Sequence, residues 1–136
     1  MKNIKVLSIK EPFATLIKEK RKLIETRSWK TNYRGELYIH ASISKSNLNN
    51  KNQSFIELTK DLSFNPGYIL CKCKLVDCIY MTKEYIEDMK KNHYQEYLCG
   101  LYEEGRYAWI LDNIEPIEKI IPAKGKLNIW NYQLDK

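Results

Sequence analysis

Hydrophobic and polar residues alternate in several short stretches of this chain, as they do in strands with one buried face. The clearest stretch is 36–42, in which Leu37, Ile39 and Ala41 are predicted to point inward and the residues between them, His40 included, to point the other way. Further strands are predicted, chiefly from β-branched and aromatic residues, over 5–9, 22–27, 68–79, 106–112 and 117–120.

Other segments carry their apolar residues at helical spacing. Helices are predicted over 13–20, over 55–62 and over 83–91, the last with Thr82 as its N-cap. Strands and helices in this mixed order do not fit a regular βαβ repeat. They predict an α+β fold in one domain spanning 1–136: a small, mostly antiparallel sheet or β-barrel with about three flanking helices.

Composition places the chain among globular proteins, since 43% of its residues are hydrophobic and 29% are charged. No apolar run approaches the ~20 residues that span a bilayer, and no apolar signal region follows the first residues, so we expect a cytoplasmic protein with no membrane partner. The four cysteines form no C-x-x-C pair, and no histidine stands at zinc-finger spacing. They are therefore predicted to be small core residues, and neither a metal nor a cofactor is expected.

The net charge of +6 is unevenly distributed. Residues 1–51 hold twelve Lys/Arg and four Asp/Glu, whereas residues 52–136 hold eleven and thirteen. A basic first third on a nearly neutral remainder indicates a surface that faces a polyanion; a solvated, lysine-rich surface is the alternative.

Basic side chains gather in residues 22–35, directly after the first predicted helix. Arg27 and Arg34 suit bidentate contacts with phosphates or base edges. Lys22 and Lys30 suit phosphate contacts as point charges.

Two aromatic residues and a carboxylate lie among these cations. Trp29 and Tyr33 are candidate platforms on which unpaired bases stack, at roughly 1–3 kcal/mol per base. Glu25 would accept a hydrogen bond from a base edge or an amine. The alternatives are structural: Trp29 as a cap on the sheet, Glu25 in an ion pair with Arg27, and His40 as a satisfied polar residue.

The sequence Lys20-x-Lys22-x-x-Glu25-x-Arg27 resembles the G-x-K-x-x-E-x-R pattern of the ASCH family, with Lys20 in place of the glycine. These small domains are homologous to the C-terminal region of a transcription coactivator. Residues 7–14, 28–35, 39–42, 107–109 and 124–130 resemble further family segments, whereas 44–64 and 80–104 match poorly.

The resemblance implies a stand-alone bacterial or phage-type member with a PUA-like β-barrel and a cleft lined by Lys22, Glu25 and Arg27. It also implies binding of RNA or single-stranded nucleic acid there. One branch of the family hydrolyses the acetyl amide of acetylated cytidine with a Lys and a Thr on this strand and a distant Glu. That Thr falls at Glu25 here, and Thr26 would point to the opposite strand face, so the departure counts against this activity.

Three hypotheses follow. The first is binding of RNA, single-stranded nucleic acid or one modified nucleotide in the cleft. The second is a nucleoside amidohydrolase or ribonuclease, acting on an acylated cytidine or on RNA, with Lys22 as base and Glu25 as its partner. The third is a protein-interaction module that uses Tyr33 and Trp29. A strand over 22–27 puts Lys22 and Glu25 on opposite faces, so the pair requires Lys22 to belong to the preceding turn.

Overall fold

The computed structural model describes residues 2–135 and contains one six-stranded sheet with four helices. The strands are β1 (Lys2–Glu11), β2 (Ile24–Arg27), β3 (Gly35–Lys45), β4 (Tyr68–Tyr80), β5 (Tyr107–Pro122) and β6 (Ile129–Leu134). The helices are α1 (Phe13–Lys18), α2 (Gln53–Thr59), α3 (Lys83–Asn92) and α4 (Tyr94–Leu98). The strand order is β2-β5-β4-β3-β1-β6, and β1 with β3 is the parallel pair. The predicted α+β, mostly antiparallel fold is thus confirmed.

The barrel is open along one seam. β6 pairs with β1 only as far as Leu7, so the remainder of β1 has no strand on that side. The other end of the sheet, β2, faces this free stretch, and Nη2 of Arg27 donates a hydrogen bond of 2.8 Å to the carbonyl of Ser8. A side chain, and not a strand ladder, therefore joins the two ends of the sheet.

Both faces of β3 are buried over 37–41, although the alternating pattern predicted one buried face. Leu37, Ile39 and Ala41 are fully buried as predicted. The expectation that the intervening residues face outward is wrong for Tyr38 and His40, which are 5% and 1% exposed. The reason is a second apolar cluster on that face, to which β1, β4 and β6 contribute; it consists of Ile4, Val6, Tyr38, Ile69 and Trp130.

The elements also differ from prediction in number and extent, and β6 was not predicted. The segments 106–112 and 117–120 form one continuous strand, β5, that runs through Pro116. Proline is tolerated there for two reasons. β2 pairs with β5 only over Tyr107–Ile110, so it does not reach Pro116. The register between β4 and β5 also shifts on either side of Cys71, which is the partner of Pro116. A fourth helix, α4, follows α3 directly, and the N-cap role of Thr82 is confirmed by its bond from the Tyr85 amide.

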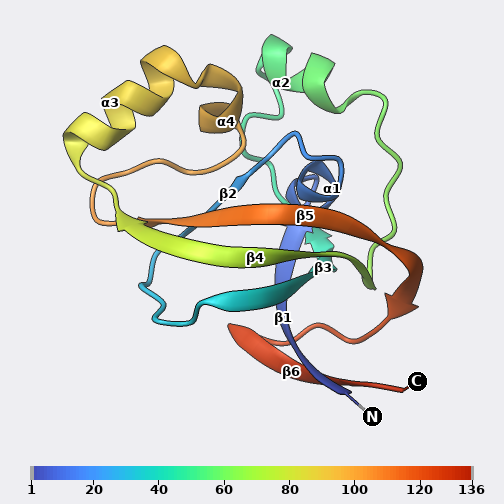
Figure 1. The fold of residues 1–136 in the computed structure, drawn as a ribbon. Coiled ribbons are helices and arrows are strands. Elements are labelled where there is room, and N and C mark those ends of the chain that lie inside the picture. The colour runs from blue at the N-terminus through green and yellow to red at the C-terminus, as the bar shows by residue number, and fades with distance from the viewer. Residues whose placement is uncertain (1, 136) are drawn as a thin grey trace.

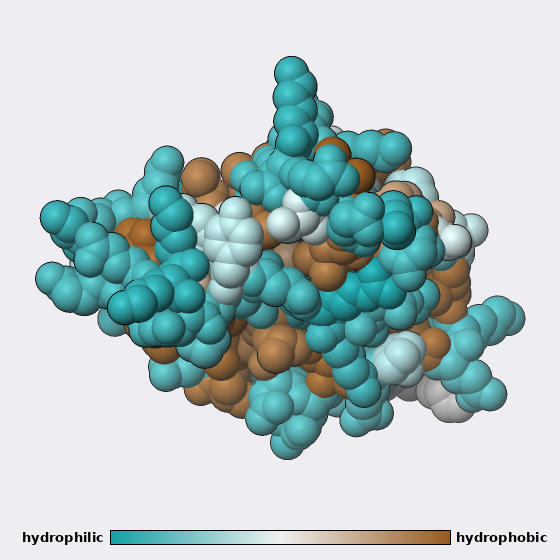
Figure 2. Space-filling model, turned by 90° about the horizontal axis from the view of Figure 1, so that it is seen from above, coloured by the Kyte–Doolittle hydropathy of each residue, from teal (hydrophilic) through white to brown (hydrophobic). Residues whose placement is uncertain are grey.

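Three of the four thiols lie in the main core, as expected, whereas Cys78 is only partly buried against it. Burial raises the pKa of Cys73 to about 12 and that of Cys99 to about 12, which makes both unreactive apolar groups. In Figure 1, α2, α3 and α4 lie above the sheet, while both ends of the chain lie beside β6. The helical side presents mostly hydrophilic side chains with apolar surface in the hollows between them (Figure 2). Among residues 2–135, no helix is long and apolar enough to cross a membrane.

Candidate nucleic-acid interface

A cleft of about 860 Å³ lies at the open seam of the sheet. Its walls come from β1, β2 and β3, from residues 99–101 after α4, and from residues 123–128 between β5 and β6. Cations dominate its charged lining, since six basic side chains accompany a single carboxylate, that of Glu25. The six are Lys10, Lys22, Arg27, Arg106, Lys124 and Lys126.

Lys22 belongs to the turn before β2, which settles how it reaches Glu25. Its backbone amide and that of Arg21 both donate to the carbonyl of Leu16, at the end of α1. Lys20 has a φ of 63°, a left-handed conformation that glycine adopts without strain. Lys20 stands where the pattern that this sequence resembles has glycine, the residue that this backbone conformation favours.

The Lys22 side chain is 1% exposed and its ammonium is fully engaged. Nζ donates to the carbonyl of Ile24 at 2.5 Å and to the carbonyl of Cys99. It also lies 3.5 Å from Oε1 of Glu25, and 5.3 Å from the centre of the Phe13 ring. These contacts join α1, β2 and the segment after α4 beneath the cleft.

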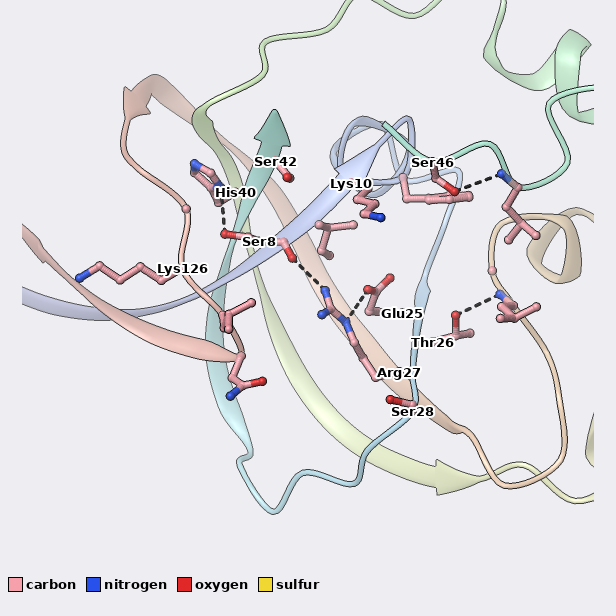
Figure 3. A pocket seen from close by; sticks show the side chains of 18 of the residues that line it. Ser8, Lys10, Glu25, Thr26, Arg27, Ser28, His40, Ser42, Ser46 and Lys126 are labelled. Atoms are coloured by element: carbon pink, nitrogen blue, oxygen red, sulfur yellow. Dashed lines mark hydrogen bonds and ion pairs between the residues drawn. The ribbon is translucent and has the colours of Figure 1, made fainter. Parts of the chain in front are cut away.

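Glu25 and Arg27 lie two residues apart on one face of β2 and form an ion pair. Nε of Arg27 donates to Oε2 of Glu25 at 2.8 Å, while Nη2 donates across the seam to Ser8 (Figure 3). Within residues 2–135, Nη1 of Arg27 makes no hydrogen bond, and Oε1 of Glu25 has only its ion pair with Lys22. The floor of the cleft therefore retains one donor group and one acceptor atom for a ligand.

The segment 80–104 provides one wall of the site through the residues that follow α4. Glu96 of α4 accepts hydrogen bonds from the amides of Leu23 and Ile24, at 2.9 and 3.0 Å. Burial raises the pKa of Glu96, although the nearby Lys22 opposes that rise. The hydroxyl of Thr26 accepts from the amide of Leu101 at 3.1 Å. Nothing in the sequence signalled this capping of the free edge of β2.

Two other predicted residues also line the cleft. Trp29 packs edge-on against Trp109, with ring centres 4.7 Å apart, and its carbonyl accepts from the Trp109 indole. His40 lies 3.0 Å from the hydroxyl of Ser8 through Nδ1 and 2.7 Å from the carbonyl of Ala123 through Nε2. The structure thus brings five of the predicted site residues together: Lys22, Glu25, Arg27, Trp29 and His40.

Lys30, Tyr33 and Arg34 do not line this cleft. Tyr33 lines a neighbouring hollow of about 530 Å³, and its hydroxyl donates to the carbonyl of Glu36. Nη1 of Arg34 donates to the carbonyls of residues 31 and 33, which stabilises the turn. Lys30 is exposed beside them. Sequence reasoning missed Lys10 and Arg106 as cleft residues; strand alternation from Ser8 could have identified Lys10.

The open α+β barrel and its basic seam define a PUA-like protein. A family model of the ASCH domain matches residues 7–121, so the chain belongs to the ASCH domain family, as the pattern around Lys22 predicted. The crystal structure of ASCH from Zymomonas mobilis has a TM-score of 0.55 with this chain and is 16% identical, covering 87% of this chain and 72% of that one. A tyrosine-to-phenylalanine mutant of the same protein gives a TM-score of 0.55 at 15% identity, with coverage of 87% and 74%. No curated protein sequence matches the chain.

Proposed function

We propose that this protein binds RNA or another single-stranded nucleic acid, with one nucleotide held in the cleft at the seam. The observation that carries the proposal is the charge of the lining, six basic side chains against one carboxylate. Such a concentration of positive charge attracts the phosphates of a nucleic acid and makes affinity depend on salt.

The cations at the mouth of the cleft suit phosphates better than those at its floor. Lys10, Lys124 and Lys126 are exposed, and none of them forms an ion pair within residues 2–135. Lys22 and Arg27, in contrast, already share the charge of Glu25. The phosphates are therefore assigned to the mouth.

The floor suits the edge of a base. A phosphate placed there would be repelled by Glu25, whereas a base offers N–H donors to Oε1 of Glu25 beside acceptors for Nη1 of Arg27. Apolar surface for the base faces comes from Ile43 and Leu127, which are 81% and 88% exposed at the cleft, and from Trp29.

Fluorescence anisotropy with labelled single-stranded RNA and DNA oligomers, each at two salt concentrations, tests the proposal. Replacing all three mouth lysines by alanine removes up to three phosphate contacts. It is expected to reduce the slope of log affinity against log salt by about 2. The matched control replaces Lys83, Lys90 and Lys91 of α3 by alanine, the same loss of charge on an exposed helix.

Two results would count against nucleic-acid binding in this cleft. One is wild-type binding that does not weaken with salt. The other is an equal loss of affinity in the mouth triple variant and the α3 control. Stronger binding of the RNA oligomer than of the DNA oligomer would identify RNA as the ligand.

The hydrolase alternative with Lys22 as base gains no support from the contacts. The N–H groups of the Lys22 ammonium are directed to two carbonyls and to Glu25. An ammonium in these contacts has no lone pair with which to accept a proton from a substrate or water. The hydroxyl of Thr26, which also lines the cleft, already accepts a hydrogen bond from the Leu101 amide. Turnover of an acylated cytidine or of RNA by the wild type, lost in Lys22→Met, would favour this alternative over binding alone.

A further inference from the structure

A serine and a histidine lie in hydrogen-bond contact in the wall of the same cleft, and the nucleotide site does not use them. Ser8 of β1 and His40 of β3 are direct partners in the parallel pairing of these strands. Both line the cleft, with His40 on the far side of Ser8 from Arg27 (Figure 3). We propose that they form a nucleophile and base that take an acyl group from a carboxylic ester bound in the cleft.

The hydrogen bonds fix which nitrogen of His40 carries the proton. Nε2 lies 2.7 Å from the carbonyl of Ala123, and a carbonyl only accepts, so Nε2 is the protonated nitrogen. Nδ1 therefore presents its lone pair to the hydroxyl of Ser8, 3.0 Å away. A nucleophile bonded to a base, with the base oriented by a third group, is the arrangement that activates a serine.

The surroundings hold this arrangement in place. His40 is 1% exposed, and its ring packs edge-on against Trp130 with centres 5.7 Å apart. The indole N–H of Trp130 donates to Oγ of Ser8 at 3.1 Å, which directs the serine proton toward His40. Gly125 covers the pair so closely that a Cβ there would lie 3.0 Å from both Cε1 of His40 and Oγ of Ser8.

Positive groups lie where charge would develop during acyl transfer. The guanidinium of Arg27 already contacts the backbone of Ser8 through Nη2, and its Nη1 makes no hydrogen bond within residues 2–135. Lys10 follows Ser8 on the same face of β1 and also lines the cleft. Both are placed to stabilise the oxyanion of a tetrahedral intermediate.

The reaction proceeds in two balanced steps. Oγ of Ser8 bonds to the ester carbonyl carbon and Nδ1 of His40 takes the serine proton. The bond to the alcohol oxygen then breaks, and the alcohol leaves with that proton. In the second step the oxygen of water bonds to the acyl carbon while Nδ1 of His40 takes a proton from that water. The bond from the acyl carbon to Oγ of Ser8 then breaks, Oγ recovers the proton from His40, and the carboxylic acid departs.

An alkyl fluorophosphonate probe tests the proposal, because it forms a stable bond to an activated serine with loss of fluoride and of the serine proton. Wild-type protein is expected to gain one adduct, which peptide mass spectrometry assigns to Ser8. Ser8→Ala abolishes it, and His40→Asn slows it by about 100-fold or more. Ser54→Ala, a change at an exposed serine of α2 that does not line the cleft, leaves the rate unchanged.

A purely structural role, in which Ser8 and His40 only join β1, β3 and the loop before β6, predicts no adduct. Absence of an adduct on Ser8 in the wild type overturns the proposal whatever the variants do. An equal labelling rate in folded His40→Asn overturns it too, as does an adduct confined to another serine. Thermal unfolding of each variant shows whether it is folded, and the oligomer titrations test nucleic-acid binding separately.

Discussion

Replacing Lys22 by methionine tests whether the floor of the cleft stabilises the fold. Methionine is of similar length, so the packing beside Phe13 is largely kept while the ammonium is lost. The carbonyls of Ile24 and Cys99 lose their donor, and the buried Glu25 retains only Arg27 as its cation. Removing one partner of a buried ion pair costs about 3–5 kcal/mol in the free energy of unfolding.

Because methionine is apolar and avoids the burial of a charge, we place the loss at the lower end, about 3 kcal/mol. For a chain of this size that corresponds to a decrease in Tm of roughly 10 °C. Urea unfolding followed by tryptophan fluorescence measures it, with Lys30→Met as the matched control, since Lys30 is exposed and should change stability by less than about 0.5 kcal/mol.

The double variant Lys22→Met/Glu25→Gln separates the ion pair from the rest of the effect. Removing both charges leaves no unpaired buried carboxylate, so the double variant should be destabilised by less than the two single losses added together. A loss below about 1 kcal/mol in Lys22→Met, or strict additivity in the double variant, would refute the view that this pair stabilises the fold.

Three further predictions concern the seam and its surroundings. Arg27→Lys removes the guanidinium, whose two nitrogens bond to Glu25 and to the Ser8 carbonyl. This change should lower the free energy of unfolding, measured in urea, by about 1–3 kcal/mol. Burial raises the pKa of Glu11 in the folded state. The stability that protonated Glu11 contributes is therefore largest in acid, and it is lost as the pH rises through the raised pKa of the folded state. The stability of the wild type minus that of Glu11→Gln should therefore increase as the pH falls from 7 to 4, and a constant difference would contradict it. Gly125→Ala places a Cβ against His40, and should lower the free energy of unfolding by about 1–3 kcal/mol, measured by thermal melts.

The strands and the family could be predicted because their signals are local. The alternation of Leu37, Ile39 and Ala41 identified the inner face of β3, and three charged residues at fixed spacing around Lys22 identified the family. Lys22 itself shows the limit of strand periodicity, since its contact with Glu25 depends on where the turn ends and β2 begins.

What the sequence did not reveal depends on contacts between distant segments. Glu96 caps β2 from more than seventy residues away, and the carbonyl of Cys99, three residues after Glu96, accepts a hydrogen bond from Lys22. Alternation along β3 assigns His40 to the outer, solvent-facing side of the strand. The segment that carries Ala123 and Gly125 covers that side, so His40 is buried. No period in the local sequence carries such information.

The residues that mark the family are, in this chain, largely engaged with one another and with the backbone. Lys22 must lie in a turn to pass beneath β2, and Glu25 and Arg27 must share a strand face two residues apart to bridge the seam. In this chain, the spacing K-x-x-E-x-R thus allows the three side chains to join the turn after α1, the strand β2 and the facing strand β1. A bound nucleotide would then contact what the seam leaves unused: Nη1 of Arg27 and Oε1 of Glu25 at the floor, and the lysines at the mouth of the cleft.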